Sequence, residues 1–137
     1  MSSADTARDL NVLRQDVGDP RLTYLGLSYG TVIGATYASL FPDKVQAMVL
    51  DGTLDFTGNA TGHHPGEAAA SPWTSEAAVR ELGNARLLKV NGDGHTSMYV
   101  EPSTCRDDAE LAYLVSLRLP PKGAACDVDQ LPFGLTP

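Results

Sequence analysis

The 137-residue sequence is poor in basic residues: ten Lys and Arg stand against 17 Asp and Glu, a formal net charge of -7. Such a chain has no basic surface with which to release phosphate counterions, so neither nucleic acid nor a membrane is expected as a partner. No hydrophobic run approaches the length of a membrane span. The start, Met1 to Asp5, lacks the positive and apolar regions of a secretory signal peptide. On these residues alone we expect a cytoplasmic protein or a mature fragment.

Cysteine is scarce as well, with only Cys105 and Cys126. No further ligand residue has metal-site spacing with them, so we expect neither zinc nor another metal or cofactor. Two cysteines are compatible with free thiols in a reducing compartment and with a disulfide in an oxidising one. The residues alone do not distinguish these states.

Apolar periodicity predicts alternating helices and strands. Leu10, Leu13 and Val17 recur at helical spacing and predict a first helix, capped by Ser2 or Ser3. The later apolar runs predict strands at residues 22–27, 45–50 and 86–90 and helices at 31–40, 74–82 and 107–117. The strand, helix, strand order favours a parallel sheet with a right-handed crossover. Residues 51–72 have no period and predict a long loop.

A G-x-S-x-G motif, residues 26–30, lies between the first predicted strand and the second predicted helix. In this context it is typical of the nucleophile elbow of an α/β hydrolase, where a serine occupies a sharp strand-to-helix turn. Ser28 is therefore the expected nucleophile, and the backbone N–H of Tyr29 an expected oxyanion-hole donor. A Gly-rich turn that only packs is the alternative.

A serine nucleophile needs a histidine base and a carboxylate that orients this base. His95 is the best candidate base, because it follows a strand and a Gly-rich turn and comes after Ser28 in the chain. A surface histidine in a turn is the alternative interpretation. His63 and His64 lie in the long loop and are expected to face solvent, with at most adventitious metal binding.

The acid is expected at the carboxyl end of the strand at 45–50, where Asp51 and Asp55 both lie. We prefer Asp55, because Asp51 directly ends the strand and is placed to hydrogen-bond nearby backbone instead. An ordinary loop aspartate is the alternative interpretation of Asp55.

Several blocks share the pattern of one known family: residues 7–10, 24–31, 34–38, 41–45, 49–52, 94–95, 105, 113–114, 119–121, 123, 126 and 131–133. They resemble the actinobacterial tripeptidyl and prolyl aminopeptidase-like branch of the α/β hydrolases, and they cover most of the chain outside the long loop. The resemblance implies that Ser28 is the nucleophile and His95 the base. It also implies that Cys105 and Cys126 form a disulfide and that the protein is of secreted origin.

Members of that family are much longer. In them, strands before the elbow carry the second oxyanion donor, and a helical cap follows the strand that corresponds to 45–50. The stretch corresponding to the family's acid, residues 68–73, has no carboxylate. Because loss of one oxyanion donor costs about a hundredfold to a thousandfold in rate, and the cap is absent, aminopeptidase specificity is not carried over.

We therefore predict a truncated α/β hydrolase fold with about three parallel strands and flanking helices. One domain would comprise an elbow half (1–55), a loop in place of the cap (56–73) and a C-terminal half with the histidine (74–137). The expected function is a serine hydrolase that cleaves small ester or amide substrates, peptides included, through Ser28, His95 and Asp55. The alternative is a catalytically weak or inactive remnant that acts as a binding or assembly module. The exposed sheet edge predicts a homo-oligomer.

Overall fold

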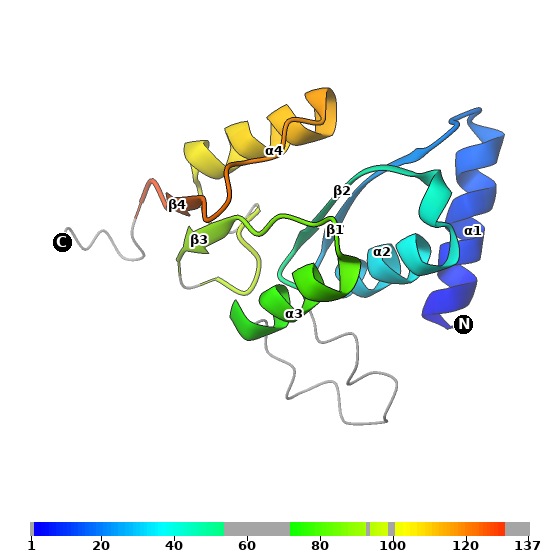
Figure 1. Cartoon of the computed structure of the whole chain (residues 1–137), viewed down its shortest axis with the longest axis horizontal. Coiled ribbons are helices and arrows are strands. Elements are labelled where there is room, and N and C mark those ends of the chain that lie inside the picture. The colour runs from blue at the N-terminus through cyan, green and yellow to red at the C-terminus, as the bar shows by residue number, and fades with distance from the viewer. Residues whose placement is uncertain (1, 54–71, 93, 99–100, 131–137) are drawn as a thin grey trace.

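A computed structural model describes residues 2–53, 72–92, 94–98 and 101–130 (Figure 1). Helices and strands alternate over most of this part of the chain, as the sequence predicts. In chain order they are α1 (Ser3–Asp16), β1 (Leu22–Leu27), α2 (Tyr29–Leu40), a short 3-10 helix (Pro42–Lys44), β2 (Val45–Asp51), α3 (Pro72–Leu82), β3 (Lys89–Asn91), α4 (Thr104–Ser116) and β4 (Ala125–Asp127).

The first two helices pack together on one side of the β1–β2 pair, with α1 outermost (Figure 1). A capping box starts α1: the Ser2 hydroxyl accepts from the Asp5 N–H at 3.2 Å, and the Asp5 carboxylate accepts from the Ser2 N–H at 3.1 Å. The predicted apolar face is only partly used, because Leu13 and Val17 are exposed while Ala7 is fully buried. A helix that packs on a single neighbour buries a narrow stripe.

The central sheet is a parallel pair, β1 with β2, whose register matches Leu27 with Asp51. The third predicted strand exists but does not join this sheet, which corrects the expected three-stranded core. It is shorter than expected, β3, and it pairs in parallel with β4 instead. On the side of β2, helix α4 approaches, and the Tyr113 hydroxyl accepts a long hydrogen bond from the Met48 N–H at 3.5 Å.

Side-chain contacts attach the remaining elements. Cys105 at the start of α4 and Cys126 in β4 form a disulfide with a Cα–Cα distance of 5.6 Å. The buried Thr53 after β2 shares a 2.6 Å hydrogen bond between hydroxyls with Ser75 of α3. Helix α3 starts at Pro72, two residues before the predicted start. Within the described residues, no helix is both long and apolar enough to span a membrane.

Candidate active site

Ser28 occupies the turn between the last residue of β1 and the first residue of α2. Its backbone adopts φ 50° and ψ -117°, a conformation that L-residues rarely take. The Ser28 N–H donates to the Asp51 carbonyl at 3.0 Å, and the Ser28 carbonyl accepts from the Thr31 N–H at 2.9 Å. Such strain persists only where the surroundings enforce it, and it is characteristic of a nucleophile elbow.

The Tyr24 ring packs closely against two glycines, Gly26 before the turn and Gly34 within α2. A Cβ atom at Gly26 would lie 2.7 Å from both the Gly30 carbonyl oxygen and the Tyr24 ring, and one at Gly34 would lie 2.8 Å from the same ring. The Tyr24 hydroxyl donates to the Gly30 carbonyl at 2.9 Å. Burial of this side chain raises the pKa of the Tyr24 phenol. The Tyr24 side chain thus packs against the first turn of α2 and hydrogen-bonds to it.

The predicted nucleophile and base lie together although they are 67 positions apart in the sequence. The distance from Ser28 Oγ to His95 Nε2 is 2.9 Å. Ser28 is half-buried, whereas His95 is exposed. This geometry suits a proton transfer from the serine hydroxyl to the imidazole. Tyr29 is the first residue of α2, so its N–H has no partner within the helix ladder, and the Tyr29 side chain is exposed.

The loop that carries His95 is held by the end of β2. Both carboxylate oxygens of Asp51 accept from the Ser97 N–H, at 2.9 and 3.1 Å, and one also accepts from the Met98 N–H at 2.7 Å. The Ser97 hydroxyl donates to the same carboxylate at 3.1 Å. The next residue, Gly52, has φ +67°, and a Cβ there would lie 2.6 Å from the His95 carbonyl oxygen. The loop therefore rests directly on Asp51 and Gly52.

The acid predicted to orient His95 does not appear within this part of the structure. Asp55, His63 and His64 lie outside the described residues. The hydrogen bonds of the Asp51 carboxylate go to loop backbone and a hydroxyl, and none goes to the His95 ring. Asp51 thus makes backbone hydrogen bonds, as its position at the strand end suggested, but with residues 46 and 47 positions away.

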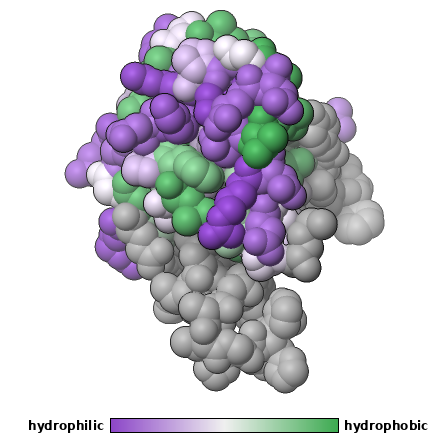
Figure 2. Space-filling model, turned by 90° about the vertical axis from the view of Figure 1, so that its right-hand side faces the viewer, coloured by the Kyte–Doolittle hydropathy of each residue, from purple (hydrophilic) through white to green (hydrophobic). Residues whose placement is uncertain are grey.

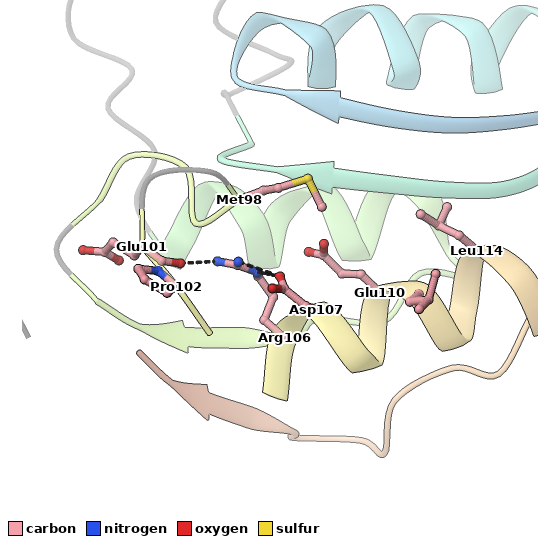
Figure 3. Close-up of a pocket in the computed structure, with 8 residues that line it drawn as sticks. Met98, Glu101, Pro102, Arg106, Asp107, Glu110 and Leu114 are labelled. Atoms are coloured by element: carbon pink, nitrogen blue, oxygen red, sulfur yellow. Dashed lines mark hydrogen bonds and ion pairs between the residues drawn. The ribbon is translucent and has the colours of Figure 1, made fainter. Parts of the chain in front are cut away.

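A pocket of about 500 Å³ lies between the His95 loop and α4 (Figure 3). Its lining residues are Met98, Glu101, Pro102, Arg106, Asp107, Glu110, Leu111 and Leu114. The Glu110 side chain points from α4 toward Met98 (Figure 3). Burial, with a smaller contribution from the Asp51 charge, raises the pKa of Glu110 to about 7. Its Oε2 atom is buried and makes no hydrogen bond. Neither Ser28 nor His95 lines this pocket.

Among the described residues, no cluster of three or more His, Cys, Asp or Glu side chains is arranged to hold a metal ion. The described residues bring together a serine, a histidine and a backbone donor at the elbow. Sequence reasoning missed two supporting roles. One is the hydrogen bond of Tyr24 to the first turn of α2, and the other is the need for glycine at position 52. A glycine directly after a strand was the available signal for the second role.

Comparisons with known proteins show the family of this chain. The alpha/beta hydrolase fold family matches residues 1–75, and the family described as TAP-like protein matches residues 41–126. Each match covers more than half of the chain. This chain therefore belongs to the α/β hydrolase fold family, in its TAP-like branch.

Two curated relatives show the same likeness over a short region. The chain is 51% identical over 55 residues to the tripeptidyl aminopeptidase of Streptomyces lividans, a match over 40% of this chain and 10% of that protein. It is also 51% identical over 55 residues to the serine protease Hip1 of Mycobacterium tuberculosis, over 40% of this chain and 11% of that protein. The matched region thus spans about a tenth of the length of these relatives.

Proposed function

We propose that this chain is a serine hydrolase that cleaves small ester or amide substrates, with Ser28 as nucleophile and His95 as general base. The observation that carries the proposal is the 2.9 Å contact between Ser28 Oγ and His95 Nε2, made by a serine on a strained strand-to-helix turn. A base at this distance activates a serine hydroxyl by accepting its proton. The names of the relatives, an aminopeptidase and a serine protease, favour peptides among the amide substrates.

In the proposed reaction, His95 Nε2 takes the Ser28 hydroxyl proton as Oγ attacks the carbonyl carbon of the substrate. The carbonyl oxygen becomes negative and accepts a hydrogen bond from the Tyr29 backbone N–H, at the positive end of the α2 dipole. Collapse of this intermediate breaks the ester or amide bond, and the imidazolium returns the proton to the departing alcohol or amine. Water then releases the acyl group from Ser28 by the same steps.

Asp55 remains the proposed acid that orients His95, in the triad order expected of the family. Its support is its position in the sequence, four residues after Asp51, the last residue of β2. Replacement by asparagine keeps the shape and removes the charge, so Asp55→Asn is expected to lower turnover, and unchanged turnover would remove this residue from the proposal. We also retain, as a proposal, the division of the domain into 1–55, 56–73 and 74–137.

A fluorophosphonate probe tests the proposal, because it reacts rapidly only with an activated serine. We expect the chain to be labelled at Ser28, and we expect Ser28→Ala to abolish labelling and His95→Ala to slow it strongly. Ser116→Ala, at the exposed end of α4, is the matched control and should label like the wild type. Labelling that survives in Ser28→Ala would refute the proposal.

We further propose that the chain forms a homo-oligomer. Within the described residues, β1 pairs with β2 on one edge and with no strand on the other. The α1 side of the molecule is largely hydrophilic with separate apolar patches (Figure 2), and Val12, Leu13 and Val17 of α1 are more than half exposed. Open edges and apolar patches favour association. Light scattering over a dilution series is the test, and a monomer at every concentration would refute it.

A further inference from the structure

The end of β2 brings together the two halves of the proposed site. Asp51 is the last residue of this strand and lies in register with Leu27, the residue before the nucleophile. The main chain of Asp51 binds the elbow, because its carbonyl accepts a hydrogen bond from the Ser28 N–H at 3.0 Å. The position of Asp51 relative to Ser28 is therefore fixed by the sheet itself.

The side chain of Asp51 binds the loop that carries His95. The carboxylate accepts from two consecutive backbone N–H groups and one hydroxyl, at Ser97 and Met98, and the shortest of these hydrogen bonds is 2.7 Å. Hydrogen bonds to a carboxylate are about twice as strong as those between neutral groups. Ser97 lies two residues beyond His95, so little chain separates the anchor from the base.

The main chain of His95 also packs against Gly52, the residue after Asp51. The approach of its carbonyl oxygen to Gly52 leaves no room for a Cβ atom there. The loop thus has a polar anchor at the Asp51 carboxylate and a close backbone contact one residue further along the chain. These two contacts hold the main chain at His95 and directly after it, although the His95 side chain itself is exposed.

We propose that Asp51 is a positioning residue that couples the nucleophile elbow to the His95 loop and so sets the Ser28–His95 distance. Its importance for catalysis rests on the proposed function, whereas its effect on the position of His95 does not. It differs from the role assigned to Asp55, because Asp51 acts on the loop and not on the imidazole ring. A loss of position approaching 1 Å lowers the rate of an enzyme about a hundredfold.

The test uses the full chain and a readout that needs no activity. The ring C–H resonances of His95 are identified by NMR from their loss in His95→Gln, which is simple in a protein with three histidines. Replacement of Ser28 by alanine should shift these resonances, because the hydroxyl contacts the ring. In Asp51→Ala, the same replacement should no longer shift them. This double substitution reports coupling between the two residues and not stability.

Asp129→Ala is the matched control. The Asp129 carboxylate also accepts from a backbone N–H and a hydroxyl, both of Thr104, at 2.9 and 2.8 Å, but at the start of α4. The Ser28-dependent shift should persist in this variant. Should Asp51→Ala fail to fold, Asp51→Asn keeps one acceptor oxygen and should reduce the shift without abolishing it. Fluorophosphonate labelling is measured in parallel, with an expected loss of about a hundredfold for Asp51→Ala and none for Asp129→Ala.

The outcomes separate the two proposals. In one outcome the probe does not label the wild type, but the Ser28-dependent shift is present in the wild type and lost in Asp51→Ala. This outcome would refute the hydrolase and support the positioning role. A shift that persists undiminished in Asp51→Ala or Asp51→Asn, or that is absent from the wild type, would overturn the positioning role. Hydrolysis of p-nitrophenyl butyrate adds a further check: displacement of the base should lower kcat and leave KM near its wild-type value.

Discussion

Replacement of Gly52 by alanine is the sharpest perturbation that the site allows. Position 52 has φ +67°, and an added Cβ atom would lie 2.6 Å from the His95 carbonyl oxygen and 2.8 Å from the Thr96 methyl carbon. The first neighbour is backbone and cannot rotate away. The substitution therefore has two effects, backbone strain at residue 52 and displacement of the loop that carries the base.

Gly83 separates these two effects. It has almost the same backbone angle, φ +69°, but an added Cβ atom would meet nothing within 4 Å. Alanine in a left-handed conformation costs about 1–2 kcal/mol at either position. At Gly52 the contact adds the cost of overpacking, about 1–3 kcal/mol, since the carbonyl must move by roughly half an ångström. We expect Gly52→Ala to be less stable than Gly83→Ala by about 1–3 kcal/mol.

Thermal unfolding and fluorophosphonate labelling together measure both effects. For a chain of this size, 1 kcal/mol corresponds to roughly 4 °C, so the two variants should differ in Tm by about 4–12 °C. Labelling of Gly52→Ala should slow by about ten- to a hundredfold at a temperature where both variants are folded, whereas Gly83→Ala should label normally. Equal Tm values and equal labelling rates would refute the argument that the His95 loop rests on Gly52.

Three further predictions follow from other contacts. Because burial raises the pKa of Glu110 to about 7, the folded protein loses stability as the pH rises from 4.5 to 7; Glu110→Gln should remove this loss, about 1–2 kcal/mol for a half-buried group, and identical pH profiles of Tm would contradict it. Replacement of Cys105 and Cys126 by serine should lower the free energy of unfolding by about 3 kcal/mol in a denaturant titration, and an unchanged midpoint would count against a stabilising disulfide. Tyr24→Phe keeps the ring and loses the hydrogen bond to the Gly30 carbonyl, so Tm should fall by an amount equivalent to about 1 kcal/mol, and a wild-type Tm would show that the hydroxyl is dispensable.

Local features of this protein were readable from the sequence because short-range physics dictates them. The strand at 22–27 has the predicted bounds, and Ser2 caps α1 as expected. The elbow followed from five consecutive residues, since a strand-to-helix turn at a G-x-S-x-G motif needs no distant partner to be recognised. The fold family followed in turn, and family comparison confirms it.

Features that depend on several distant segments were less accessible. Strand β4 has three residues, too few for a period, and its pairing partner β3 lies 34 or more residues earlier in the chain. The alternation of helices and strands predicted one sheet of about three parallel strands, with the strand at 86–90 as its third member. In the structure the β2 side of the sheet faces α4 instead.

The sequence by itself determined which residues are the nucleophile and base candidates, because chain order and local turn chemistry identify Ser28 and His95. Only the tertiary structure decided that these side chains meet at 2.9 Å, and that Asp51 binds the loop of the base and not its ring. The physical reason is that a contact across 67 residues depends on strand register, on helix packing and on the room that one glycine leaves. None of these is encoded in a local pattern of residues, and each is settled only when the whole chain packs.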